Sequence, residues 1–122
     1  MARPDDELFG FIASSFRSIW ALELLLLLKS ERRAWSHAEL VAALRASELV
    51  VNNALEGLVA AGTASVDAEG ATYLPANDDI ARRVDQAEQL YATRPNAVRR
   101  AIIAASSSSA AAFADAFKLR RD

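Results

Sequence analysis

The chain has 122 residues, enough for one compact domain with its own hydrophobic core, and its formal net charge is −2. Hydrophobic residues make up 52% and charged residues 25% of the sequence, which excludes intrinsic disorder. There is no cysteine, which excludes a disulfide scaffold and a thiolate metal site and suits a cytoplasmic protein.

The most apolar stretch, residues 19–28, is not expected to span a membrane. It is about ten residues long and contains Glu23, whereas a spanning helix needs roughly 20 apolar residues. The segment before it, residues 4–7, is acidic, whereas a signal peptide begins with positive charge. We therefore expect a buried core helix and no membrane contact.

Two helices are predicted at the start of the chain. Residues 5–15 should form a short flanking helix with acidic residues at its beginning, where the helix dipole favours them. Phe9 and Phe11 make this helix hydrophobic, and we expect them to contact a dimer partner or another part of the fold. The next helix should cover residues 16–30 and be buried on most sides, because five consecutive leucines leave it no polar face.

Two more helices, joined by a tight turn, are predicted after a short extended piece. Ser36 and Glu39 fit a capping box, which starts a helix over residues 37–45. Ser47 is placed to cap the second helix, over residues 48–61.

A β-hairpin is predicted after this second helix. Gly62 can end the helix in a left-handed turn. The runs 63–67 and 71–74 resemble strands, and the link between them contains Gly70.

The C-terminal third is predicted to be helical. Residues 79–94 carry apolar side chains along one stripe, and one of three polar residues at positions 77–79 should cap this helix. Pro95 can start the flanking segment 96–120, which contains four serines in an expected loop and then a last helix. In that last helix Phe113 and Phe117 lie one turn apart, and we expect them to contact a partner.

The order of these elements resembles a winged-helix domain of small bacterial transcription regulators. In that family a short strand after the first helix pairs with the hairpin, a role that would fall here to Ala34 and Trp35. The hairpin resembles the wing, and the flanking helices are similar to those that build the dimer interface of MarR-type regulators. The resemblance covers residues 16–94 of a single domain spanning 1–122. It implies a mostly α fold with a small antiparallel β-hairpin, a winged helix-turn-helix with extra N- and C-terminal helices.

The charge distribution departs from that resemblance. Residues 36–74 hold one arginine against five acidic residues, whereas residues 80–122 hold eight cations against four acids. The hairpin carries Asp67 and Glu69, where a wing of this family often carries a basic residue. DNA-binding proteins draw much of their affinity from Lys and Arg that neutralise phosphates.

The helix over residues 48–61 supplies the candidate binding face. A helical wheel divides it into a core side and an outward side. The expected core residues are Val50, Val51, Ala54, Leu55, Leu58 and Val59. The expected outward residues are Leu49, Asn52, Asn53, Glu56 and Ala60.

The function predicted from this face is that of a homodimeric DNA-binding transcription regulator, and a protein-binding adapter is the alternative. As a homodimeric DNA-binding regulator, the protein would turn Asn52, Asn53 and Glu56 toward bases, because Asn can pair with adenine and Glu with cytosine. The phosphate contacts would then come from other cations, of which the main candidates are Arg32, Arg33 and Arg45. Alternatively, the protein is a winged-helix adapter that binds another protein through exposed Leu49 and does not bind DNA.

The single histidine, the two tryptophans and the paired arginines do not indicate a catalytic or metal-binding site. His37 is the single histidine, so with no cysteine we expect no catalytic constellation, metal site or cofactor, and no enzyme. Trp20 and Trp35 are expected to be core residues. The pairs Arg82-Arg83 and Arg99-Arg100 are expected on the polar faces of amphipathic helices, some of them paired with Asp85 or Glu88. The alternative is a basic patch that contacts the DNA backbone or an acidic partner.

Overall fold

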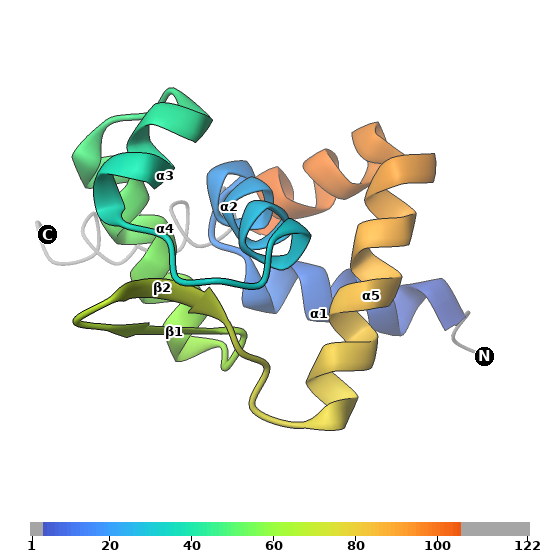
Figure 1. Cartoon of the computed structure of the whole chain (residues 1–122). Helices are drawn as coiled ribbons and strands as arrows, with labels where there is room; N and C mark the ends of the chain where they lie inside the picture. Colours follow the sequence, from blue (N-terminus) through green and yellow to red (C-terminus); the bar gives the residue numbers. More distant parts are fainter. Residues whose placement is uncertain (1–3, 106–122) are drawn as a thin grey trace, which may run out of the picture.

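The computed structural model describes residues 4–105 (Figure 1). Its elements are α1 (Pro4–Ser15), α2 (Ile19–Ser30), α3 (His37–Leu44), α4 (Glu48–Ala60), β1 (Ala64–Asp67), β2 (Gly70–Tyr73) and α5 (Asp78–Thr93). Residues 95–105 are also helical. The structure is therefore mostly α with a small antiparallel hairpin, as predicted. The expected serine loop, the last helix and the partner contacts of Phe113 and Phe117 lie outside the described residues.

The apolar helix α2 lies at the centre of the fold, between α5 on one side and the α3–α4–hairpin part on the other (Figure 1). It contacts α3, α4 and β2, and Leu24, Leu25 and Leu28 are fully buried. The helix begins at Ile19, later than the predicted residue 16, because Ser18 is extended and its hydroxyl accepts the Ala21 N–H at 3.2 Å. In the described part of the chain, no single helix is long and apolar enough to cross a membrane.

The predicted caps of α3 and α4 are confirmed. The Ser36 hydroxyl accepts the Glu39 N–H at 3.1 Å, and the Glu39 carboxylate accepts the Ser36 N–H at 2.9 Å, which completes the capping box. Arg45 ends α3 in a left-handed conformation with φ 54°. Two residues later, the Ser47 hydroxyl accepts the Val50 N–H at 3.1 Å and starts α4.

The hairpin is built against Trp35. β1 pairs with β2 in antiparallel register, from Ala64 opposite Tyr73 to Asp67 opposite Gly70. On the other side of β2, Trp35 and Ala71 exchange two N–H···O bonds of 2.8 Å, so Trp35 takes the predicted pairing role.

Two glycines set the ends of these segments. Gly62 has φ 75°, which confirms the left-handed end predicted for α4. Gly70 has φ 133°, and a Cβ atom there would lie 2.3 Å from the Trp35 carbonyl oxygen. Only glycine therefore lets β2 approach Trp35 this closely.

The core confirms one tryptophan and corrects the other. Trp35 is buried, with its indole N–H donating to the Glu31 carbonyl at 3.0 Å. Trp20, predicted to be a core residue, is 41% exposed. It lies in the first turn of α2 and lines a hollow together with Val50 and Asn53 of α4, so it meets solvent at the edge of the packing between the two helices.

Helix α5 is tied to α2 by ion pairs that differ from the predicted ones. Lys29 of α2 lies 3.1 Å from Asp85 and 2.7 Å from Glu88, and these contacts raise the Lys29 pKa, chiefly through the Glu88 hydrogen bond. The arginines at positions 82 and 83 pair with Asp79 instead, at 2.8 and 3.0 Å. The two arginines follow Asp79 by three and four positions on the same helix, so both can reach its carboxylate. Asp85 and Glu88 pair with Lys29 of α2 instead.

Candidate functional site: an apolar and acidic face on α4 and the hairpin

The outward side of α4 has the predicted polar residues. Asn52, Asn53 and Glu56 are all exposed, and Leu49 is 68% exposed. The opposite side packs into the core through Val51, Ala54, Leu55 and Leu58, which are buried. The helical wheel therefore placed these residues correctly.

Val59 departs from the prediction. It was expected in the core but is 45% exposed. The buried side of α4 includes Gly57 instead. Gly57 lies beneath the Arg17 side chain, and a Cβ atom added there would lie 3.4 Å from the Arg17 Cδ. Val59 is consequently left beside Asn52 and Glu56 on the outward side.

A groove of about 420 Å³ lies between α4 and β1. It is lined by Asn52, Leu55, Glu56, Val59, Ala60 and Val66. Val66, on β1, is 53% exposed, so apolar side chains of two elements meet solvent in one hollow. A second hollow of about 330 Å³ adjoins it, shares Asn52, Leu55 and Val66, and extends to Asp67 and Glu69 at the hairpin turn.

The charged side chains that line these two hollows are the acids Glu56, Asp67 and Glu69, and His37 also lines the second hollow. Residues 46–74 contain four acids and no Lys, Arg or His. The four are exposed, and they are Glu48, Glu56, Asp67 and Glu69. The Asp67 carboxylate accepts the Glu69 N–H at 2.8 Å, which fixes the turn of the hairpin. We call this surface the α4–hairpin face, formed by Leu49, Asn52, Asn53, Glu56, Val59, Ala60, Val66, Asp67 and Glu69.

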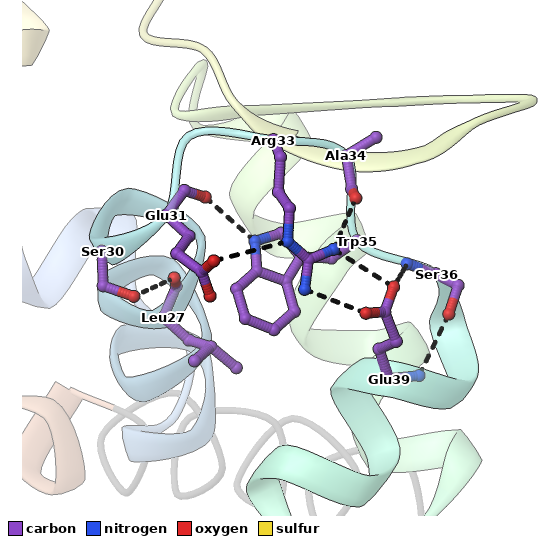
Figure 2. A network of polar contacts seen from close by, with 8 residues as sticks. All are labelled: Leu27, Ser30, Glu31, Arg33, Ala34, Trp35, Ser36 and Glu39. Atoms are coloured by element: carbon purple, nitrogen blue, oxygen red, sulfur yellow. Dashed lines mark hydrogen bonds and ion pairs between the residues drawn. The ribbon is translucent and has the colours of Figure 1, made fainter.

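Arg33, one of the predicted phosphate contacts, is engaged by neighbours (Figure 2). Its guanidinium lies 2.9 Å from the Glu39 carboxylate, 3.8 Å from that of Glu31 and 3.9 Å above the Trp35 ring. The Arg33 hydrogen bond, followed by that of the Ser36 backbone, lowers the Glu39 pKa to about 2. A phosphate would have to compete with two carboxylates for this guanidinium.

Arg32 and Arg45, the other two predicted phosphate contacts, are both exposed. Arg32 lies over the Tyr73 ring of β2, 5.1 Å from its centroid. Arg45 lies in the turn between α3 and α4. Neither of them lines the hollows of the α4–hairpin face.

The phenylalanines of α1 contact their own chain. Phe9 and Phe11 are half-buried against the core, and the Phe11 ring meets that of Phe16 edge-on at 6.3 Å. The guanidiniums of Arg94 and Arg83 lie over Phe9 and Phe11, at 5.8 and 6.0 Å. The partner contact predicted for the two phenylalanines stays a prediction.

Sequence reasoning missed the groove itself. Its signal was indirect: two valines, Val59 and Val66, lie close to acids in a segment without cations. Within residues 4–105, no group of three or more His, Asp or Glu side chains is arranged to hold a metal ion. Comparison with protein-family models, with curated proteins and with solved structures gave no match to this chain.

Proposed function

We propose that the chain is a cytoplasmic winged-helix adapter that binds another protein through the α4–hairpin face. The winged-helix assignment is supported by the order of α2, α3, α4, hairpin and α5, and by the bridge from Trp35 to Ala71 beside β2. The resemblance to small bacterial regulators gives the same order of elements.

The observation that carries the proposal is the apolar groove on a face without cations. Protein interfaces combine a desolvated apolar centre with a polar rim, and here Val59 and Val66 would form the centre and Glu56 part of the rim. A DNA-binding surface needs cations that replace the counterions of the phosphates. The acids of the α4–hairpin face would repel phosphates instead.

The second candidate is a homodimeric DNA-binding transcription regulator. It is favoured by a specific observation: Asn52, Asn53 and Glu56 are exposed together on a helix that follows a tight turn. These side chains have the donors and acceptors for direct base readout. In this candidate, Arg32 and Arg45 contact phosphates, and the flanking helices hold the dimer.

Fluorescence anisotropy with mixed genomic DNA fragments separates the two candidates, on protein whose oligomeric state is measured by sedimentation. The titration runs from low to physiological salt. For an adapter, we expect no DNA binding at physiological salt. Binding that persists there, and that is lost when Asn52→Ala and Asn53→Ala are combined, would establish the regulator and refute the adapter. Leu49→Arg is the variant matched to the Asn52→Ala and Asn53→Ala pair. It changes the same face by adding a cation, and it leaves the side-chain amides of Asn52 and Asn53 in place.

A further inference from the structure

We infer that the partner of this protein presents a basic amphipathic helix, which places its apolar side chains in the groove between α4 and β1. The inference rests on the proposed adapter function and adds the chemistry of the partner to it. Three features of the α4–hairpin face support it: the groove, the acids around the groove and the absence of cations from residues 46–74.

The groove suits a helix because side chains of two elements form it. Val59 comes from the last turn of α4 and Val66 from β1, and they are 45% and 53% exposed. Leu55 and Ala60 also line the hollow. An amphipathic helix fits such a groove with apolar residues spaced three and four positions apart. Burying the valines against these residues would supply the affinity.

The acids determine the charge of the partner. Glu56 lines the groove itself, and Asp67 and Glu69 line the adjoining hollow. Lys or Arg on the polar side of a bound helix would lie near these carboxylates. Because the acids are exposed, they would mainly speed the encounter and make binding sensitive to salt.

Charge also argues against a second copy as the occupant of the groove. Two α4–hairpin faces placed together would bring like charges into opposition, which is costly at an interface.

The chain's own residues 113–121 do have the right chemistry, because two phenylalanines precede Lys118, Arg120 and Arg121. They are the competing occupant, and the experiment distinguishes them from an external partner.

The probe is a fluorescein-labelled peptide of Leu and Lys with an amphipathic helical pattern, and its control has Glu in place of each Lys. Both are titrated into the full chain by anisotropy at two salt concentrations. We expect the Lys peptide to bind, to weaken as salt rises, and to shift the backbone amide resonances of Glu56, Val59 and Val66. We expect no binding of the Glu peptide.

Two pairs of variants test the two parts of the recognition. Glu56→Lys should weaken the Lys peptide about tenfold, the equivalent of about 1.4 kcal/mol, whereas Glu7→Lys makes the same charge change on α1 and should not. Val66→Asp should also weaken binding although it adds a negative charge, because it removes an apolar anchor. Ile103→Asp is its control, since Ile103 is equally exposed, at 56%, and does not line the groove. Circular dichroism verifies that each variant is folded.

Several outcomes would overturn the inference. They are equal binding of the two peptides, resonance shifts outside the α4–hairpin face, or no peptide binding by a chain that also ignores DNA. Salt-resistant DNA binding that needs Asn52 and Asn53 would instead refute the adapter function itself. A combined Lys118→Glu, Arg120→Glu and Arg121→Glu variant completes the test. If this variant binds the Lys peptide with unchanged affinity, an external partner is supported. If it binds the peptide about tenfold more tightly, the groove is assigned to the chain's own residues 113–121.

Discussion

Glu39 shows how one side chain serves two structural roles. Its carboxylate completes the capping box of α3 and also holds the guanidinium of Arg33 over Trp35 (Figure 2). The sequence pattern predicted the first role, because Ser36 and Glu39 are three positions apart. In the second role, Glu39 forms an ion pair with Arg33, so a phosphate would have to compete with this carboxylate for the guanidinium.

The lowered pKa of Glu39 predicts a particular pH dependence. The folded value is about 2 against an ordinary 4.5, so the ionised carboxylate stabilises the fold above pH 4.5, and this contribution is lost as the pH falls toward 2. Glu39→Gln keeps an acceptor for the capping box and removes the charge. Urea unfolding between pH 7 and pH 2 should therefore show a shallower loss of stability for this variant. Parallel curves for the variant and the natural chain would contradict this account, and Glu7→Gln serves as the exposed control.

Gly70 and Gly10 predict opposite effects of the same substitution. Gly70→Ala should lower the free energy of unfolding by about 2 kcal/mol or more, because φ is positive and the new Cβ meets the Trp35 backbone. Gly10→Ala should raise it by about 0.5–1 kcal/mol, because Gly10 lies inside α1 with nothing within 4 Å of the added Cβ. Denaturant unfolding measures both. A neutral Gly70→Ala would show that β2 can move away from Trp35 at little cost.

At the scale of elements, the position of α4 decides what the α4–hairpin face contains. The helix is held by buried Val51, Ala54, Leu55 and Leu58, and its contacts with α2 and β1 fix the rotation that leaves Val59 outside. The candidate site therefore depends on how α4 starts and packs.

The start of α4 gives a prediction for its cap. Ser47→Ala removes the acceptor of the Val50 N–H and should lower the free energy of unfolding by about 1 kcal/mol. Ser47→Asp should retain most of the stability, since Asp caps equally well and its charge suits the N-terminus of a helix. Thermal and urea unfolding of both variants test this. Equal losses for Ala and Asp would mean that the hydroxyl is needed for something other than capping.

At the scale of the whole molecule, polar links join the central helix to the C-terminal part. Lys29 of α2 binds two acids of α5, and Glu23 of α2 accepts the Tyr91 hydroxyl at 2.5 Å. Arg99, in the helical residues 95–105, donates to the same hydroxyl at 3.2 Å. Burial, followed by the Glu23 hydrogen bond, raises the Tyr91 pKa. These links fix α5 and the following helix against α2.

The Tyr91 link predicts coupling between two substitutions. Tyr91→Phe leaves the Glu23 carboxylate without this donor on a mostly buried helix, and should lower the free energy of unfolding by about 1–3 kcal/mol. When Glu23→Leu is also present, the same change should have a much smaller effect, because no carboxylate is left without its donor. A double-mutant cycle by denaturant unfolding measures the coupling. Additive effects would show that the hydrogen bond contributes nothing of its own.

The sequence by itself determined the local features of this protein. The capping box at Ser36, the cap at Ser47 and the left-handed end at Gly62 are all observed, and each involves residues only a few positions apart. The cap of α5 is Asn77, one of the three residues predicted for it. The pairing partner of the hairpin, Trp35, was also predicted, but only through the family resemblance. Periodicity correctly separated most of α4 into a buried and an exposed side.

The tertiary structure decided which residues meet across elements. Lys29 bonds to Glu88, 59 positions away, and the groove combines Val59 of α4 with Val66 of β1. Trp20 and Val59 are exposed, although both were predicted to be core residues. Periodicity shows which residues share a face of a helix, but it does not show what packs against that face or how far the packing extends. The candidate site lies where that packing ends, so sequence predicted its polar residues and only the fold revealed its groove.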